Sequence, residues 1–420
     1  MKLTSIIDKK AQSADYMVDE ITHICKTFGK RDPGSQGEHD ACDYMADVLK
    51  NDCGCEKVAV EPFEVHPDSF FGWIYFTFSF AIASLITLFF MPLLSAILFV
   101  CALTCAFLQF GIYKKFLDKC FPKKTSHNVT AVKSCSGEVK RRIFFNGHPD
   151  AAWEWPANYR FGGVVFEMLA VIATVGAFFY GVLGLLLVIA RKSVGFAILT
   201  GAGSEHIYFI LGLCGLVFLP FWIYMFFMWN KKLIVDGAND NLTGCYMGIA
   251  ILKALKDQGI ILENTEVGVI LSGSEEAGLR GAKAWGKAHA EEYKNDKAET
   301  IIVSYDTIRE SKYLMVNYRN INGTMRTDKQ ICDMLVDASK EQNIHLIKGW
   351  VPPFGGATDD AAFVQAGLRA AGITGLNHNL QNYYHTRRDT YDNMGKECLA
   401  DCFAVSVQLL EDYDSGKYDK

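Results

Sequence analysis

Residues 70–113 carry no charged side chain, and this run restricts the fold of the chain more than any other feature of the sequence. It is long enough for two membrane-spanning helices of roughly 20 residues each, with Pro92 at the turn between them. Two more uncharged runs follow, and the loop between them carries Arg191, Lys192 and Glu205. A buried helix pair in a soluble core is the alternative, but a soluble helix rarely lacks a polar face. We therefore expect four spans, at about 70–91, 93–113, 166–190 and 207–229.

The polar sequence around these runs predicts their orientation. Residues 1–50 are polar and charged, and they lack the apolar core of a signal peptide. Basic residues flank the spans on the side of the polar domain, whereas the loop between the last two spans offers only Arg191 and Lys192. The flanking basic residues are Lys114, Lys115, Lys119, Lys123, Lys124, Arg160, Lys231 and Lys232. We expect an integral, multi-pass membrane protein whose polar domain and both termini lie in the cytoplasm.

The charge and the cysteines exclude several classes of protein. A net charge of -5 gives no reason to expect a nucleic-acid partner. The 13 cysteines are odd in number, and Cys101, Cys105 and Cys214 fall inside the predicted spans, so a disulfide framework is not indicated. The spacing Cys53-Gly-Cys55 is too short for the usual C-x-x-C site. We interpret the cysteines as reduced thiols of a protein that faces the cytosol and the lipid bilayer; the oligomeric state stays open, including a homo-oligomer.

Outside the spans, the apolar pattern alternates between strands and helices. This order predicts an α/β fold with a mostly parallel central sheet covered by helices, beside a four-helix transmembrane region. Such sheets bind ligands at the carboxyl ends of their strands. The expected strands are 57–65, 128–133, 141–147, 264–272 and 299–305, and the expected helices are 11–28, 38–50, 242–257, 278–290, 329–341 and 396–412. The catalytic domain would comprise 1–69, 114–160 and 231–420, and the two transmembrane hairpins 70–113 and 161–230.

Five residues of metal-binding type occur in order along the chain, each at the end of a probable strand. One acidic residue between two pairs of histidine and carboxylate is what a dinuclear zinc centre needs, because a carboxylate can bridge two cations. The acid Glu275 stands beside one proposed ligand and is free to act as a base. The five are His148 in N-G-H-P-D, Asp240 in G-A-N-D-N-L-T-G, Glu276 in S-E-E-A-G-L-R-G, Asp306 in V-S-Y-D-T and His385 in Y-Y-H-T-R-R-D-T.

Each of these residues also has an ordinary structural interpretation. Asp240 alone would favour a helix cap, and Glu275-Glu276 is typical of a solvated loop. His385 fits a half-buried histidine beside two tyrosines, and Asp306 fits turn chemistry at a strand end. All of these interpretations would have to hold together, and in this order, for the metal site to be absent.

At these residues the chain resembles the dinuclear zinc aminopeptidase family, which includes bacterial leucyl aminopeptidases, aminopeptidase Y and the catalytic part of glutamate carboxypeptidase. The resemblance also rests on R-D-P-G-S-Q-G at Arg31 to Gly37, and it covers about residues 10–66, 125–152 and 231–415. Two features depart from the family pattern. The stretch between His148 and Asp240 is longer than expected, and Asp360 stands where many members carry a histidine, in G-G-A-T-D-D-A-A-F.

The resemblance implies a role for each site residue. Asp240 would bridge two Zn²⁺ ions, with His148 and Asp306 completing one and Glu276 and His385 completing the other. Asp150 would orient the imidazole of His148. Glu275 would take a proton from the metal-activated water and pass it to the leaving amine.

We therefore expect a membrane-embedded zinc metallo-exopeptidase, most simply an aminopeptidase that acts on short cytosolic peptides. Three other functions stay open. An amidohydrolase would keep the chemistry but take lipid-linked substrates, such as N-acyl amino acids or lipopeptides. A non-catalytic receptor or scaffold would have no use for the complete ligand set. A cyclising transferase similar to glutaminyl cyclase would not need all five ligands.

Overall fold

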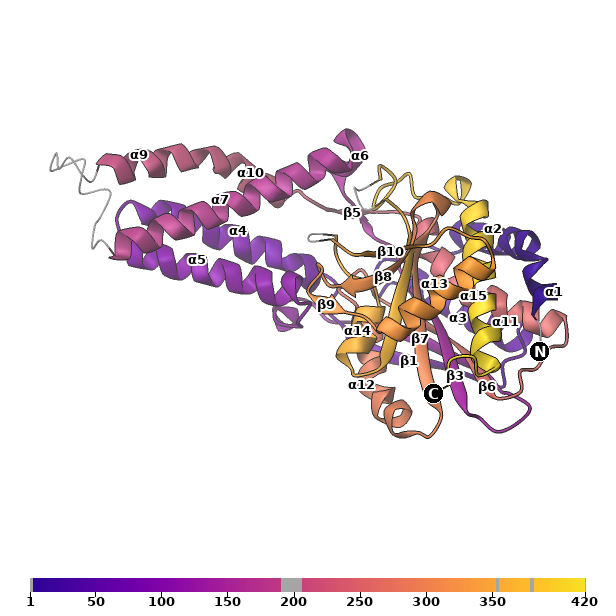
Figure 1. Cartoon of the computed structure of the whole chain (residues 1–420). Helices are drawn as coiled ribbons and strands as arrows, with labels where there is room; N and C mark the ends of the chain where they lie inside the picture. The colour runs from indigo at the N-terminus through magenta and orange to yellow at the C-terminus, as the bar shows by residue number, and fades with distance from the viewer. Residues whose placement is uncertain (1–2, 190–205, 353–354, 378–380, 420) are drawn as a thin grey trace. The chain divides into compact units, whose positions relative to one another are not determined.

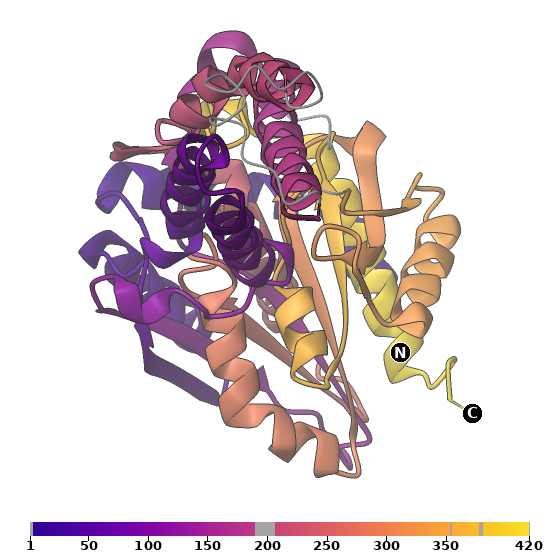
Figure 2. The same ribbon diagram turned by 90° about the vertical axis from the view of Figure 1, so that its left-hand side faces the viewer.

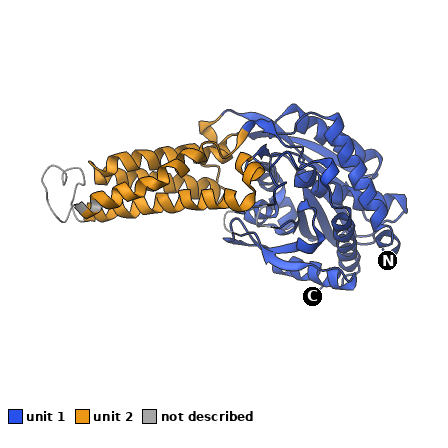
Figure 3. Cartoon of the chain, turned by 90° about the horizontal axis from the view of Figure 1, so that it is seen from above, with its two compact units in different colours: residues 1–67, 122–154, 231–420 blue, residues 68–121, 155–230 orange. Residues whose placement is uncertain are grey.

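The structure is a computed structural model, and it describes residues 3–189, 206–352, 355–377 and 381–419. The chain divides into two compact units, which are coloured separately in Figure 3. Unit 1 comprises Met1–Pro67, Pro122–Glu154 and Lys231–Lys420, and unit 2 comprises Asp68–Phe121 and Trp155–Asn230.

Unit 1 is built on a mixed sheet that has nine strands in the described part of the chain, in the order β1-β2-β6-β3-β7-β11-β8-β10, with β9 paired to β8. The four central strands run parallel to one another: β6 (Thr265–Ser272), β3 (Arg141–Gly147), β7 (Glu299–Ile308) and β11 (Arg369–Gly375). The flanking strands are β1 (Lys57–Val65), β2 (Lys124–Lys133), β8 (Leu314–Asn320), β9 (Met325–Arg326) and β10 (Ile347–Trp350). Most pairings of these flanking strands are antiparallel. The predicted parallel arrangement is therefore confirmed for the four central strands only.

Alternate residues of strand β3 face two different helix layers. Phe144 packs edge to face on Trp285 of α12 (Arg280–Asn295), with 5.8 Å between ring centroids. Phe145 points to the other face, where a Cβ on Gly248 of α11 (Thr243–Asp257) would lie 2.9 Å from its own Cβ. Both faces of β3 are therefore buried, which explains why residues 143–145 of this strand form a continuous apolar run.

Helices cover both faces of this sheet (Figures 1 and 2). On the face with α11 lie α2 (Lys10–Thr27) and α15 (Lys396–Asp414), which pack beside it, and α13 (Lys329–Glu341), which packs on α15. On the other face α12 packs against α14 (Asp360–Gln365). The remaining helices of unit 1 are α1 (Thr4–Ile7) and α3 (Gln36–Asn51), and a short two-stranded sheet joins β4 (Trp153–Glu154) to β5 (Asn230–Ile234).

The expected helices and strands of unit 1 agree with the structure to within a few residues. The predicted strand 57–65 is β1, and the predicted helix 329–341 is α13. The elements that were not expected include β8, β10, β11 and α14. Each of these has seven residues or fewer, and short elements of this kind show too little periodicity to be recognised.

Unit 2 consists of apolar helices. Within the described residues, three helical segments are long and apolar enough to cross a membrane by length and composition: Ser69–Leu88, Pro92–Gly111 and Gly163–Ile189. The first is α4, the second is α5 (Pro92–Ala106) with its one-turn extension, and the third is α7. Pro92 opens α5, as expected, because proline needs no hydrogen-bonded amide in a first turn. A short helix, α6 (Pro156–Phe161), precedes α7.

The fourth expected span, 207–229, is not one helix of spanning length. Its described part is α9 (His206–Gly215), a single tighter turn at Leu216–Phe218, and α10 (Leu219–Met225). Pro220 lies in the first turn of α10 and has no amide hydrogen to continue the preceding helix. The apolar stretch Phe209–Met225 is therefore shorter than the other three, and the predicted loop 191–205 lies outside the described residues.

Polar and small residues join the helices of unit 2. Ser84 of α4 and Ser95 of α5 are buried, and each hydroxyl donates to the carbonyl of the other residue, at 3.0 and 2.8 Å. Glycines let α7 approach its neighbours closely, since a Cβ on Gly181 would overlap the ring of Phe99. By contrast, large apolar side chains such as Phe178 (50%) and Leu185 (54%) are exposed. Small residues inside and apolar residues outside are typical of helices that pack in lipid.

Candidate metal centre

The predicted site residues meet at one edge of the central sheet. His148 follows β3 directly, and the pair Glu275-Glu276 lies in the loop after β6. Asp306 is near the end of β7, and His385 is in the segment after β11. Asp240 lies in the irregular turn Ala238–Leu242 that leads into α11. Because parallel strands end at the same edge, residues far apart in the sequence come together here.

The five predicted ligands form two groups that share one residue. His148, Asp240 and Asp306 offer ligand atoms that all lie within 4.8 Å of one another, and so do Asp240, Glu276 and His385. The two oxygens of Asp240 point to different groups: Oδ1 lies 3.3 Å from His148 Nε2, and Oδ2 lies 3.2 Å from His385 Nε2. A bridging carboxylate needs this division of its two oxygens.

The distances between donor atoms fit zinc. His385 Nε2 lies 3.3 Å from Glu276 Oε1 and 3.2 Å from Asp240 Oδ2. In a tetrahedral zinc site with ligand bonds of about 2.0–2.2 Å, neighbouring donor atoms are about 3.3–3.6 Å apart. Imidazole nitrogen and carboxylate oxygen are also the donors that zinc accepts in catalytic sites. The residues present therefore fit two zinc ions, although their assignment as ligands remains a prediction.

The cluster carries far more acid than base. Seven carboxyl groups surround two imidazoles, and all except the partly exposed Asp306 are buried. Burial raises the pKa of Glu276 well above its ordinary value, and the nearby charges of Asp240 and Glu275 raise it further. The seven acids are Asp150, Asp240, Glu275, Glu276, Asp306, Asp359 and Asp389. So much like charge is tolerated only if protons or cations neutralise it, and two divalent cations would do so.

His148 responds to this acidic environment. Burial by itself would lower the pKa of His148, but hydrogen bonds to Asp150 and Asp240 raise it well above its ordinary value. Burial by itself would raise the pKa of Asp240, but hydrogen bonds from His148 and His385 lower it instead. The two imidazoles thus stabilise the negative charge of the shared carboxylate of Asp240. Bound metal cations would stabilise this charge in the same way.

Asp150 connects the first histidine to the loop that carries the predicted base. Its Oδ1 lies 3.3 Å from His148 Nδ1 and accepts from the amide of Glu275 at 2.9 Å. Its Oδ2 accepts from the amide of Glu276 at 3.0 Å, and the residue is fully buried. The ring of His148 thus contacts both the backbone oxygen of Asp150, which also lies 3.3 Å from Nδ1, and its carboxylate, and this carboxylate fixes the position of the Glu275-Glu276 loop.

Asp389 and Arg31 belong to the site region, although the sequence alone indicates no role for them. Asp389, in the string Y-H-T-R-R-D-T, accepts from the amide and side chain of Asn239, both at 2.8 Å, and from the amide of Asp240 at 3.1 Å. Arg31 donates to the carbonyls of Pro149 and Asp236, at 2.7 and 2.6 Å. Both lie inside strings that carry the family resemblance, so the signal was present. Their partners could not be identified from the sequence.

Asp359 and Asp360 have different roles: Asp359 belongs to the acidic cluster, and Asp360 supports the sheet. Asp360 is fully buried and accepts from Asn320 at 2.8 Å, and its Oδ1 lies where a Cβ on Gly372 would meet it. These contacts show that Asp360, which stands where many members of the family carry a histidine, supports the sheet. Asp359 accepts a hydrogen bond from Ser272 at the end of β6, and burial raises its pKa to about 7.

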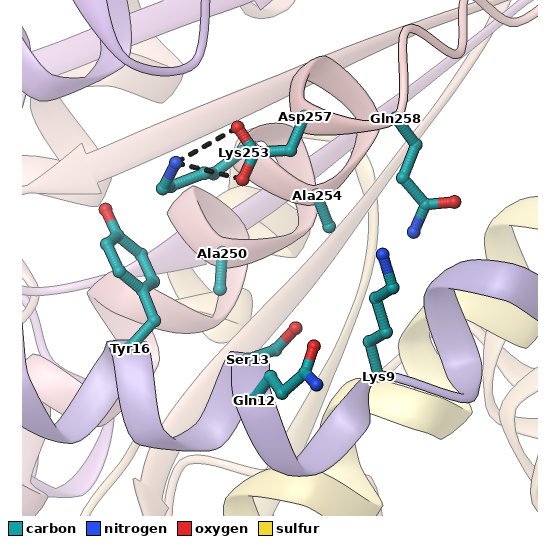
Figure 4. Close-up of a pocket in the computed structure, with 9 residues that line it drawn as sticks. All are labelled: Lys9, Gln12, Ser13, Tyr16, Ala250, Lys253, Ala254, Asp257 and Gln258. Carbon is teal, nitrogen blue, oxygen red and sulfur yellow. Dashed lines mark hydrogen bonds and ion pairs between the residues drawn. The ribbon is translucent and has the colours of Figure 1, made fainter.

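A separate cavity of about 190 Å³ lies between α2 and α11 (Figure 4). None of the predicted site residues lines it. Its polar groups are largely satisfied by the protein itself, since Lys253 pairs with both oxygens of Asp257 and Gln258 bonds to Ser5. This cavity is therefore not the candidate centre.

The comparisons with known proteins agree with the geometry. The model of Peptidase family M28 matches residues 226–410, which include Asp240, Glu276, Asp306 and His385. No curated protein matches the sequence. The family match and the ligand groups make the chain a zinc-dependent metallopeptidase.

Three solved structures show how widely this fold is shared. The zinc aminopeptidase BSAP from Bacillus subtilis has 13% identity and a TM-score of 0.54, with 94% of each chain covered. An aminopeptidase from Aneurinibacillus sp. strain AM-1 has 15% identity and a TM-score of 0.55, covering 96% of this chain and 95% of that one. A glutaminyl cyclase from Porphyromonas gingivalis has 12% identity and a TM-score of 0.55, covering 96% and 98%.

The shared carboxylate gives a prediction on metal content. Asp240→Ala should abolish binding of both zinc ions, whereas His385→Ala should weaken mainly one, because only Asp240 belongs to both groups. Elemental analysis of the purified variants would measure this. Two equivalents of zinc retained by the Asp240 variant would exclude the dinuclear arrangement.

The acid excess predicts that stability depends on pH once metal is removed. Burial raises the pKa of Asp389 to about 7, and burial raises the pKa of Asp306 to about 8. Such groups stabilise the fold fully below about pH 4, where they are protonated also in the unfolded chain, and this stability is lost as the pH rises through 7 to 8. After chelation, the melting temperature should fall between pH 6 and 8.5 by more than that of the zinc-loaded protein. Equal pH profiles with and without metal would contradict this.

Proposed function

We propose that this metallopeptidase is a membrane-embedded dinuclear zinc aminopeptidase that cleaves peptide bonds with Glu275 as the general base. The observation that carries the proposal is the pair of three-residue groups that share Asp240, with Glu275 beside them. Glu275 Oε2 lies 3.9 Å from His148 Nε2, and the residue is 9% exposed. A carboxylate next to the ligands is in the position that a base needs.

The proposed ligand roles follow the two groups. His148 and Asp306 would hold one zinc, Glu276 and His385 the other, and Asp240 both. When bound, zinc supplies Lewis acidity that polarises the scissile carbonyl and lowers the pKa of water toward about 7. Asp150, which contacts Nδ1 of His148, would keep the other ring nitrogen, Nε2, available as the donor.

Glu275 would transfer the proton in the reaction. Its carboxylate accepts a proton from the attacking water and later delivers it to the nitrogen of the leaving amine. Burial raises its pKa well above the ordinary value, and the charges of Asp359 and Asp306 act in the same direction. The hydrogen bond from its own amide to Asp150 holds the residue in place.

Hydrolysis of lipid-linked amides is the second candidate function. It is favoured by the apolar, outward-facing side chains of unit 2, which suit a protein held in a bilayer where such substrates are found. Two further functions have less support. Glutaminyl cyclisation by a single metal would leave one of the two ligand groups without a role. A non-catalytic receptor would have no need of the ligand groups or of Glu275.

A substrate screen would test the proposal. The protein, purified in detergent, is assayed with aminoacyl amides and with N-acyl amino acids, each with and without a chelator. Chelator-sensitive cleavage of the aminoacyl amides supports the aminopeptidase. Cleavage of the N-acyl amino acids alone would move the function to the lipid-linked class, and no cleavage of either would count against a hydrolase.

For the base, we predict that Glu275→Gln retains both zinc ions but loses about 10²–10⁴-fold in kcat, the usual effect of removing a general base. The matched control is Glu291→Gln, on the exposed surface of α12, which should keep wild-type activity. Zinc content and kcat are measured on the same preparations. Wild-type turnover in the Glu275 variant would show that another group is the base.

We further propose that the catalytic unit lies in the cytoplasm, because basic residues cluster at the ends of the spans that adjoin it. Accessibility reporters at the C-terminus and at position 198 would then label on opposite sides of the membrane in intact cells. A C-terminus accessible from outside would reverse the orientation and place the substrates outside the cell.

A further inference from the structure

The loop that carries Glu275 is held in place by hydrogen bonds that its own backbone amides donate to other segments. Four consecutive amides, from Gly273 to Glu276, each donate to a side-chain oxygen from another segment. Gly273 donates to Asn128 Oδ1 at 3.1 Å and Ser274 to Glu38 Oε1 at 2.6 Å. Glu275 and Glu276 donate to the two oxygens of Asp150. The loop itself is neither strand nor helix, so these side chains determine where it lies.

The backbone of the loop needs such support. Ser274 has a φ of +54°, in the left-handed region that residues with a Cβ seldom adopt. Its hydroxyl donates to the same oxygen as its amide, Glu38 Oε1, at 2.9 Å. Glu38 thus accepts two hydrogen bonds from the residue directly before the proposed base.

Glu38 is well anchored for this purpose. It lies in the first turn of α3, within the stretch R-D-P-G-S-Q-G-E, and is 0% exposed. Its second oxygen accepts from the amide of Gly34 at 2.7 Å. Three donors therefore satisfy a carboxylate that burial alone would make costly. A carboxyl group buried at such a place is unusual unless its hydrogen bonds are needed.

We infer that Glu38 is a positioning residue for the reaction: it fixes Ser274 and thereby aims the carboxylate of Glu275. The inference rests on the proposed function. Glu38 is separate from the zinc ligands, since it accepts from Gly34 and Ser274 and belongs to neither ligand group. Its loss should thus affect the chemical step and leave the zinc content unchanged. Asp150 differs in this respect, because it also contacts His148.

The test compares Glu38→Ala and Glu38→Gln with a matched control, Glu266→Ala. Glu266 is also a nearly buried acid (9% exposed), but it lies at the start of β6, where it pairs with Arg142 at 2.5 Å. For each full-length variant in detergent, kcat, KM, zinc content and melting temperature are measured. Amide hydrogen exchange is followed for a peptide that covers residues 273–276.

Glu38→Ala should lower kcat by about 10–100-fold, the scale expected when a catalytic group is displaced by about 1 Å, with KM within about threefold of wild type. Zinc content should be unchanged, and exchange at residues 273–276 should become faster. Glu38→Gln should recover most of the kcat, because its amide oxygen can still accept from Ser274. Glu266→Ala should lose stability but keep both kcat and the slow exchange.

Three results would overturn the inference: a wild-type kcat in Glu38→Ala, an unchanged exchange rate in its loop, or an equal loss of kcat in Glu266→Ala. If Glu38→Ala fails to fold, Glu38→Gln and Ser274→Ala decide instead. Ser274→Ala should lower kcat by only about two- to fivefold, because the backbone amide of residue 274 still donates its hydrogen bond to Glu38. If the wild-type protein itself cleaves no substrate, the proposed function fails. The exchange measurement then still shows whether Glu38 holds the loop.

Discussion

The site depends on one shared carboxylate in an environment that is too acidic to be stable by itself. Asp240 lies between two imidazoles, and further acids, all buried or partly exposed, lie around them at the sheet edge. In a medium of low polarity, such charges repel one another strongly, and only protons or cations relieve the repulsion. The remaining features of the edge follow from this need: carboxylates directed to the centre, carboxylates that bind backbone amides, and an arginine that donates to carbonyls.

The carboxylates divide into two kinds by what they accept. Asp150, Asp389 and Glu38 accept mainly from backbone amides, so they fix the loops that carry the other kind. Asp240, Glu276 and Asp306 keep oxygens directed to the centre. The loops need this support because they leave the strands at sharp, irregular turns. The carboxylates that hold the loops and those directed to the centre are thus the same residue types. Composition alone therefore does not distinguish the two groups.

Much of this could be predicted from the sequence. Three of the central strands, β3, β6 and β7, can be recognised because they are apolar on both faces, and several candidate ligands can be recognised because they follow these strands. Strands β8, β10 and β11 were not found, since β11 reads R-A-A-G-I-T-G and owes its conformation to pairing with β7. The partners of Asp389, Arg31 and Glu38 could not be predicted either. They depend on contacts between segments more than 100 residues apart, and a single sequence does not record those.

The order of the strands in the sheet has a consequence for how the chain matures. Strand β6 lies between β2 and β3, although both of these precede it and the second apolar insertion separates it from β3 along the chain. During synthesis, β2 and β3 therefore emerge long before β6, the strand that pairs with both. Until β6 is made, each of them has an edge without its partner strand. Unpaired edges invite association with other chains. The edges of β2 and β3 that β6 later covers are therefore open to association with other chains during translation, a hazard that the finished sheet no longer has.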